Sequence, residues 1–189
     1  MRIISGKFKG TTLNMPDSKY TRPLKDQVKE SIFNLLIHSN KISFQFEEKN
    51  ILDLYSGSGS FGLEALSRKA SKVYFVEKQI ETIKVLEKNI NKLNCKKKTI
   101  ILKEDVFKVI KSDFFYKNKF DLIFCDPPFK DLIVEKLIDT VKNKDLLKKD
   151  GIIIFHRNKN TKENLPSYFK IIEERLYGLS KIIFGCFLL

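Results

Sequence analysis

Asp126-Pro127-Pro128-Phe129 directly follows an apolar stretch, residues 120–125, of the kind that forms a buried strand. Two consecutive prolines remove two backbone N–H donors and keep the carbonyls, so this turn offers only hydrogen-bond acceptors. A planar amino group could donate one hydrogen to the Asp126 carboxylate and one to the Pro127 carbonyl, while Phe129 stacks on the attached ring. Both acceptors would stabilise the positive charge that develops on the nitrogen as it attacks a carbon. The expected electrophile is a sulfonium methyl group.

A second candidate site lies earlier in the chain, where residues 50–66 are predicted to form a strand, a glycine-rich loop and a helix. Gly57, Gly59 and Gly62 let the backbone pass where a Cβ would clash, and the N–H groups that open the helix give the loop a positive end. Glu77 ends a second apolar run, twenty residues after Gly57, the placement of a ribose-binding acid in nucleotide-binding βαβ units. We therefore expect an adenosine-like ligand here.

Acidic residues end four predicted strands or their loops: Asp53, Glu77, Asp105 and Asp126. In an open parallel sheet the carboxyl ends of the strands meet at one crevice, where ligands bind. A glycine turn could be only structural, and Asp126 could simply cap the next helix. The presence of both features in one chain favours a functional crevice.

The elements that would position these residues alternate between strands and helices. Strands are predicted at the start of 50–66 and over 73–77, 98–103, 120–125 and 152–155, with a turn at Asp150-Gly151; helices are predicted at 24–35, after the glycine loop, at 80–93 and at 132–141. Two further β-rich runs, 169–177 and 181–188, have a short connection and should pair antiparallel. The prediction is an α/β fold with a mostly parallel sheet and a C-terminal antiparallel hairpin.

The N-terminal part is basic. Residues 2–15 alternate β-favouring and basic residues about two glycines, which predicts a short hairpin, and residues 2–29 carry seven basic residues against two acidic ones. This segment is either a solvated face or a nucleic-acid contact. We expect an N-terminal extension over residues 1–49 and a main domain over residues 50–189, joined in one globular unit.

Composition limits the class of protein. At 189 residues with 42% apolar content, the chain can bury one full core. The formal net charge of +13 suggests a polyanionic partner, although only five of the 36 basic residues are arginine. The three cysteines are far apart and neither histidine is close to one in sequence, so no zinc site, other metal site or disulfide framework is predicted. No signal peptide or membrane span is evident, so a cytoplasmic location is expected. The oligomeric state stays open, with a monomer as the default expectation.

The combined motifs resemble the RsmD family of class I S-adenosylmethionine-dependent methyltransferases, which have a Rossmann-like fold and methylate N2 of a guanine in 16S ribosomal RNA. The resemblance rests on Arg2-Ile-Ile-x-Gly6, Arg22-Pro23, Asp26-x-Val28-Lys29-Glu30-x-x-Phe33-Asn34, Gly57-Ser-Gly-x-x-Gly-Leu-Glu-Ala-Leu-Ser-Arg68 and Asp126-Pro-Pro-Phe129. These motifs extend over nearly the whole chain. Each motif alone is too variable to identify a family, whereas the combination of all five is specific.

The resemblance implies roles for individual residues. S-adenosylmethionine would be bound by Asp53, Tyr55, Gly57, Ser58, Gly59, Gly62, Glu77 and Asp105, with Glu77 on the ribose and Asp105 on the adenine amino group. The guanine amine would be oriented by Asp126, Pro127 and Pro128, and Phe129 would stack on the base. Phosphates of 16S ribosomal RNA, possibly within an assembling 30S subunit, would be met by Arg2, Lys7, Lys9, Arg22 and Lys25.

Two residues depart from the family pattern. Leu24 stands where Thr usually follows Arg-Pro, which removes a potential N-cap hydroxyl, and His156 ends the fifth strand where an acidic residue is usual. We expect neither residue to touch the amine site, and we assign no role to His156.

Other functions stay open at this point. The same turn chemistry serves adenine N6 in DNA or RNA and the amide of a protein glutamine. A nicotinamide oxidoreductase would explain the glycines and Glu77, but it leaves Asp126-Pro-Pro-Phe129 without a role. A non-catalytic RNA-binding protein would explain only the basic N-terminus.

Overall fold

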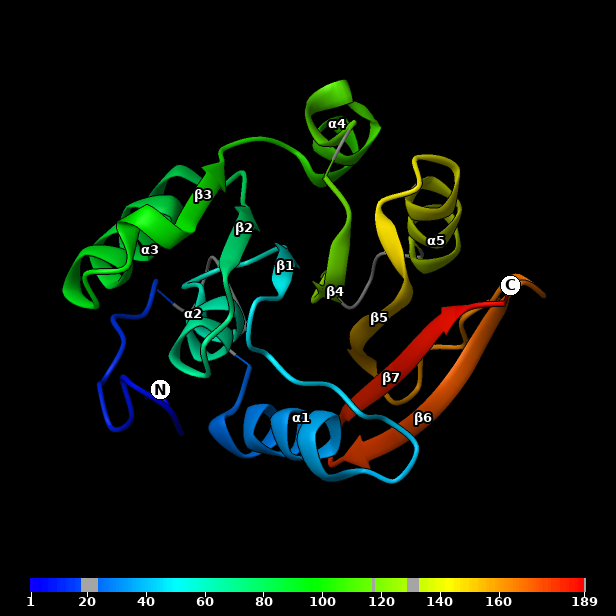
Figure 1. The fold of residues 1–189 in the computed structure, drawn as a ribbon, viewed down its shortest axis with the longest axis horizontal. Helices are drawn as coiled ribbons and strands as arrows, with labels where there is room; N and C mark the ends of the chain where they lie inside the picture. Colours follow the sequence, from blue (N-terminus) through cyan, green and yellow to red (C-terminus); the bar gives the residue numbers. More distant parts are fainter. Residues whose placement is uncertain (18–23, 117, 129–132, 189) are drawn as a thin grey trace.

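The computed structural model describes residues 1–17, 24–116, 118–128 and 133–188. Its centre is one seven-stranded sheet with the strand order β3-β2-β1-β4-β5-β7-β6 (Figure 1). The strands are β1 Asn50–Leu54, β2 Lys72–Val76, β3 Thr99–Leu102, β4 Phe120–Cys125, β5 Leu147–Asn158, β6 Phe169–Tyr177 and β7 Ser180–Phe187. β1 to β5 are parallel, whereas β7 pairs antiparallel with both β5 and β6. The predicted fold class and the C-terminal hairpin are therefore confirmed.

Helices cover both faces of this sheet. The helices are α1 Asp26–His38, α2 Ser60–Ser67, α3 Ile80–Lys92, α4 Val106–Lys111 and α5 Val134–Asn143, with short 3-10 turns at Lys96–Lys98 and Asp113–Phe115. α1, α2 and α3 pack on one face, and α4 and α5 pack on the other (Figure 1). The chain runs from β1 to β2 and β3 on one side, and then returns to place β4 on the other side of β1. Such a reversal of strand order opens a crevice at the carboxyl ends of the strands.

Successive side chains of β4 point to opposite faces of the sheet, and both faces are covered, which explains why the strand prediction succeeded. Leu122 and Phe124 belong to the core under α1, α2 and α3, whereas Ile123 and Cys125 belong to the core under α4 and α5. A parallel strand covered on both faces reads as a continuous apolar run, which is the pattern of residues 122–125.

Several predicted boundaries were wrong. β5 begins at Leu147, so the expected turn at Asp150-Gly151 lies within the strand, and the β4–β5 register shifts there. The expected N-terminal hairpin is reduced to one isolated antiparallel bridge between Arg2 and Thr12. Ile80, an apolar residue of the predicted helix 80–93, is 69% exposed at the first position of α3.

The N-terminal segment packs on the main domain, residues 50–189, mainly against α2. The buried carboxylate of Glu64 accepts hydrogen bonds from the backbone N–H groups of Ile4 and Ser5, at 2.7 and 3.0 Å. On α1, the buried ammonium of Lys29 donates to the Arg2 carbonyl at 2.8 Å. Burial lowers the pKa of Lys29, and the nearby carboxylates of Glu64 and Asp26 oppose that shift. The segment is thus held by buried polar contacts, which are costly to break.

Candidate active site

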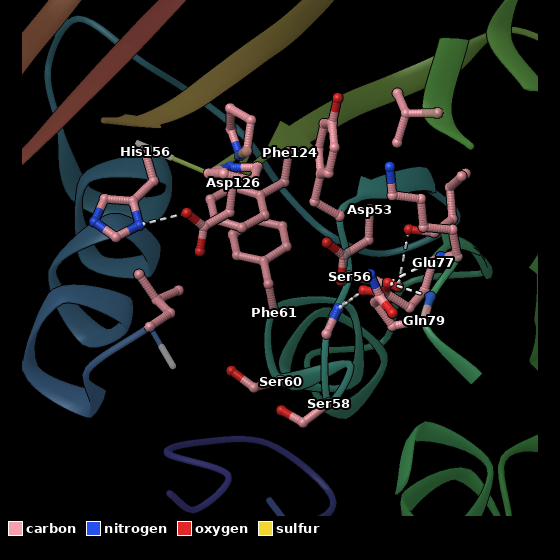
Figure 2. Close-up of a pocket in the computed structure, with 18 of the residues that line it drawn as sticks. Asp53, Ser56, Ser58, Ser60, Phe61, Glu77, Gln79, Phe124, Asp126 and His156 are labelled. Carbon is pink, nitrogen blue, oxygen red and sulfur yellow. Dashed lines mark hydrogen bonds and ion pairs between the residues drawn. The ribbon is translucent and has the colours of Figure 1, made fainter. Parts of the chain in front are cut away.

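A cavity of about 640 Å³ opens at the carboxyl ends of β1, β2 and β4 (Figure 2). Its lining includes these predicted site residues: Asp53, Tyr55, Gly57, Ser58, Glu77, Asp105, Asp126, Pro127 and Pro128. The structure therefore brings the glycine loop and the acceptor-only turn to one site. Phe129 and Arg22 lie outside the described residues.

Glu77 fixes the glycine loop. Its Oε2 accepts from the Gly57 N–H at 3.0 Å, and its Oε1 accepts from the N–H groups of Lys78 and Gln79, both at 2.9 Å (Figure 2). Tyr55 and Gly57 have φ values of 57° and 55°, a left-handed backbone that is strained for Tyr. The carboxylate at the end of β2 thereby helps to hold a tight loop at the end of β1.

Gly59 and Gly62 are not among the residues that line the cavity. A Cβ on Gly59 would lie 2.3 Å from Leu86 Cδ1, and a Cβ on Gly62 would lie 2.4 Å from Phe75 Cε1. These glycines allow α2 to pack closely on β2 and α3. Gly59 and Gly62 thus position the loop through this packing, whereas Gly57 borders the cavity.

Asp53 is the most deeply buried acid of the site. It is 1% exposed, and its Oδ2 accepts from the Gly62 N–H at 3.0 Å. Burial raises the pKa of Asp53 well above its usual value; the Gly62 hydrogen bond opposes the rise, and the charges of Asp126 and Glu77 add to it. The carboxyl groups of Asp53, Glu77 and Asp126 thus converge on one cavity, which favours a cationic ligand.

Asp105 begins α4. Its Oδ1 accepts from the Phe107 N–H at 2.9 Å as an N-cap, and its Oδ2 lies 3.3 Å from Lys78 Nζ. Partial burial acts to raise the pKa of Asp105, but these hydrogen bonds outweigh it and lower the pKa. The carboxylate lines the cavity and already has two partners.

His156 lies in the amine site, contrary to the expectation from the sequence. Its Nδ1 is 2.8 Å from Asp126 Oδ1 (Figure 2), and its Nε2 is 2.8 Å from Ser180 Oγ. The ring is 5% exposed and lines the cavity. It reaches Asp126 because β4 and β5 pair in parallel with Cys125 beside Phe155, which places the next residue of each strand side by side.

The acceptor-only turn is also held from β5 by Arg157. This side chain is fully buried; its Nη1 donates to the Pro128 carbonyl at 3.2 Å, and its Nε donates to Glu163 at 2.6 Å. Pro127 is buried and Pro128 is exposed. Two successive residues of β5 therefore support the turn, one at its carboxylate and one at its second proline.

Two stacked aromatic rings line the cavity. Phe61 of α2 and Phe124 of β4 stack with their ring centroids 3.9 Å apart, between Asp53 and Asp126 (Figure 2). Close by, the hydroxyl of Ser60 is buried and has no hydrogen-bond partner among the residues described. Ligand-binding pockets typically combine an apolar wall with a few polar groups that orient the ligand, and Phe61, Phe124 and Ser60 provide such a combination.

The N-terminal segment contributes to the cavity wall through Met1, Met15 and Leu24. Leu24 does not stand at the N-cap as expected, because Lys25 is the N-cap of α1. The predicted RNA-contacting residues Arg2, Lys7, Lys9 and Lys25 are all exposed. Basic side chains and cavity wall thus come from the same segment.

Other lining residues were not predicted. They include Ser56, Ser60, Phe61, Lys78, Gln79, Glu104, Val106, Phe107, Phe124 and Ile133. Most of them directly precede or follow a predicted site residue in the sequence. The strand ends that indicated the predicted residues therefore also indicated the positions of these neighbours. Within the described ranges there is no cluster of His, Cys, Asp or Glu that could hold a metal ion, and no helix long and apolar enough to span a membrane.

The reversed strand order, the acid-lined cavity and the adjoining acceptor-only turn define a class I methyltransferase. More particularly, the chain belongs to the family described as conserved hypothetical protein 95, the RsmD family, whose model matches residues 1–185.

Named relatives cover almost the whole chain. "Putative rRNA methyltransferase YlbH" of Bacillus subtilis is 32% identical over 96% of this chain and 96% of its own length. "Ribosomal RNA small subunit methyltransferase D" of Haemophilus influenzae is 31% identical over 95% of this chain and 90% of its own length. Among solved structures, "Putative methyltransferase yhhF from Escherichia coli" has a TM-score of 0.83 and 25% identity, covering 98% of this chain and 96% of that chain.

Proposed function

We propose that this protein transfers a methyl group from S-adenosylmethionine to the exocyclic N2 amine of a guanine in 16S ribosomal RNA, acting as a cytoplasmic monomer. The relatives named as ribosomal RNA methyltransferases support the substrate class. The acceptor-only turn supports an exocyclic amine as the group that is methylated. The choice of guanine N2 rests on the resemblance of the motifs to the RsmD family.

The residues around the cavity fit S-adenosylmethionine. The volume of about 640 Å³ lies within the range of small-molecule sites. Asp53, Glu77 and Asp126 face a ligand that carries positive charge on its sulfonium and amino groups. Glu77 accepts three backbone hydrogen bonds, which leaves about one acceptor position for a ribose hydroxyl. The unpaired hydroxyl of Ser60 offers a further polar contact.

When bound, the cofactor supplies an electrophilic methyl group. The residues of this chain prepare the nucleophile: the Asp126 carboxylate and the Pro127 carbonyl each accept one hydrogen of the substrate amine. These bonds favour the tetrahedral, positively charged nitrogen of the transition state over the planar ground state, and each is worth roughly 1.5–3 kcal/mol when one partner is charged. Asp126 then accepts the proton that the methylated nitrogen loses.

The N-terminal segment supports an RNA substrate. Arg2, Lys7 and Lys9 are exposed on the segment whose residues Met1 and Met15 line the cavity. Phosphates bound by these cations would bring a flanking nucleotide towards the acceptor-only turn. Phosphate contacts position a nucleic acid without reading its sequence, so the choice of base falls to the cavity.

The observation that carries the proposal is the meeting of the Asp126-Pro127-Pro128 turn and the acid-lined cavity at one site. Adenine N6 and a glutamine amide would use the same turn. A nicotinamide oxidoreductase would leave the turn without a role, and a plain RNA-binding protein would leave the buried acids without one.

The experiment incubates the protein with methyl-labelled S-adenosylmethionine and, in parallel, with unmodified small ribosomal subunits, naked 16S RNA, duplex DNA or a glutamine-containing protein. We expect label in one or both RNA samples only. Label confined to DNA or protein would contradict the proposed substrate. Calorimetric binding of NAD with no binding of S-adenosylmethionine would contradict the proposed reaction.

A further inference from the structure

His156 is a buried imidazole held at both ring nitrogens. Nδ1 contacts the Asp126 carboxylate at 2.8 Å (Figure 2), and Nε2 contacts the Ser180 hydroxyl, also at 2.8 Å. A ring with two such contacts and 5% exposure is fixed in its plane and its position. The Asp126-Pro-Pro motif gives no reason for a histidine here, so its contacts need a separate explanation.

The sheet itself sets this arrangement. In the antiparallel pair of β5 and β7, Asn158 lies opposite Ser180 and His156 lies opposite Ile182. Ser180 is therefore the diagonal neighbour of His156, a spacing at which side chains can touch. Asp126 follows β4 immediately, beside the β5 position of His156. Three adjacent strands thus place Asp126, His156 and Ser180 in a row.

The chemistry of the partners fixes the protonation of the ring. An ionised carboxylate only accepts hydrogen bonds, so Nδ1 of His156 must carry a proton and donate it to Asp126 Oδ1. The Ser180 hydroxyl can donate to Nε2 when the ring is neutral, or accept from it when the ring is charged. The bond to Oδ1 leaves Oδ2 of Asp126 available to a ligand in the cavity that this residue lines.

We propose that His156 is a positioning residue of the amine site, which holds the Asp126 carboxylate so that Oδ2 accepts a hydrogen from the substrate amine. His156 acts through Asp126 and does not contact the reacting atoms. Ser180 steadies the ring, which makes the C-terminal hairpin part of the support of the site. This inference rests on the proposed methyl transfer to an exocyclic amine.

The first test needs no substrate. The chain has two histidines, and His38 is exposed at the end of α1, so nitrogen-detected correlation spectra of the ¹⁵N-labelled imidazoles can be assigned by comparison with His38→Asn. We expect His156 to show a protonated Nδ1 and His38 to show an averaged solvent-exposed ring. Asp126→Ala should abolish the distinct His156 pattern. A His156 with an unprotonated Nδ1 in the wild-type protein would overturn the proposal.

The second test compares variants in single-turnover and steady-state methyl transfer. His156→Leu removes the donor, and kcat should fall about 10- to 100-fold, the loss expected for one hydrogen bond to a charged group. His156→Asn places an amide N–H close to the position of Nδ1 and should recover kcat to within about threefold of wild type. Ser180→Ala should cost a few-fold, and His38→Leu should cost nothing.

Two further readouts separate positioning from a merely structural role. The dissociation constant for S-adenosylmethionine and the melting temperature should stay close to wild type in His156→Asn and Ser180→Ala. Wild-type kcat in His156→Leu, or an Asn variant as slow as the Leu variant with an unchanged melting temperature, would contradict the inference. A wild-type protein that methylates no RNA would contradict the proposed function instead, while the imidazole spectra would still test the geometry.

Discussion

At the scale of single residues, the site is organised by acids that have different tasks. Glu77 accepts three backbone N–H groups and shapes a loop, Asp53 is buried with one backbone partner, and Asp126 is held by His156 at one oxygen. The environments differ although the three side chains face one cavity. These differences allow separate predictions for each acid.

Asp126→Ala should abolish methyl transfer, by about 100-fold or more in kcat, because it removes both an amine acceptor and the proton acceptor. Affinity for S-adenosylmethionine should change by no more than a few-fold, because the glycine loop and Glu77 remain. Calorimetry and a labelled-methyl assay measure the two quantities. Asp113→Ala, which removes an acid with a 90% exposed side chain, is the matched control. Substantial activity in Asp126→Ala would contradict the assignment.

Asp53→Asn should stabilise the free protein as the pH rises. The folded-state pKa of Asp53 is raised by burial, so the stabilising effect of its proton is complete below the unfolded value of 3.8 and is lost as the pH rises through the folded pKa. Asn keeps an acceptor for the Gly62 N–H without this loss. At pH 7–8 the variant should melt roughly 2–6 °C above wild type, and the difference should shrink towards pH 4. A constant difference across that range would contradict the account.

At the scale of elements, the glycine loop depends on close packing behind it as much as on the cavity in front of it. Gly62 has Phe75 where a Cβ would lie, whereas Gly57 has open space around it and a positive φ of 55°. A methyl group at these two positions is therefore unfavourable for different reasons, steric at Gly62 and conformational at Gly57.

Gly62→Ala should lower the free energy of unfolding by about 1–3 kcal/mol, because the Phe75 ring must move. In a protein that already carries Phe75→Leu, the same Gly62→Ala change should lower the free energy of unfolding by less than it does in the wild-type protein. Gly57→Ala should cost about 1–2 kcal/mol from its backbone conformation, with no such coupling to Phe75→Leu. Chemical denaturation of the double-mutant cycles measures both couplings. Equal coupling in the two cycles would show that Phe75 is not the obstacle.

Sequence reasoning located the strands that apolar or β-branched runs mark, and it missed the polar residues that belong to a strand. β4 and β6 were found at their observed limits, since apolar or β-branched runs mark them. The start of β5 was missed because Lys148-Lys149-Asp150-Gly151 is polar and looks like a turn, although β5 pairs with β4 at Leu147 before this run and again from Ile152 after it. Pairing with a neighbour outweighed local turn chemistry there.

At the scale of the whole molecule, the N-terminal segment connects the exposed basic surface to the cavity. Glu64 and Lys29 anchor its backbone through buried contacts, and Asn89 of α3 accepts from the Asn14 N–H at 2.8 Å. Neighbouring residues of the segment form part of the cavity wall. Contacts of this kind join residues far apart in sequence, which is why sequence reasoning found the motifs but not their mutual support.

His156 illustrates the same limit. Its role depends on Asp126, 30 residues earlier, and on Ser180, 24 residues later, across two strand pairings. A local pattern identifies a histidine at the end of a strand without identifying its partners. The four acids at strand ends were predictable because parallel strands bring their carboxyl ends together whatever the side chains are.

Replacing Arg2, Lys7 and Lys9 together by Ala should weaken RNA binding and reduce its salt dependence. Each lost phosphate contact should lower the slope of log K against log salt by about 0.7–0.9. Binding of S-adenosylmethionine should be unchanged. Filter binding across a salt series measures the slope. The charge-matched control replaces the exposed residues Lys97, Lys98 and Lys149, near the amino ends of β3 and β5. Equal losses in both triple variants would indicate a diffuse charge effect.

The most direct test of the central claim is the chemical identity of the methylated nucleoside. RNA labelled by the wild-type protein from methyl-labelled S-adenosylmethionine is digested to nucleosides, and these are separated by chromatography against standards. The account predicts that the label elutes as N2-methylguanosine, and that Asp126→Ala removes this peak. Label in N6-methyladenosine, or in any nucleoside methylated at a position other than an exocyclic amine, would contradict it.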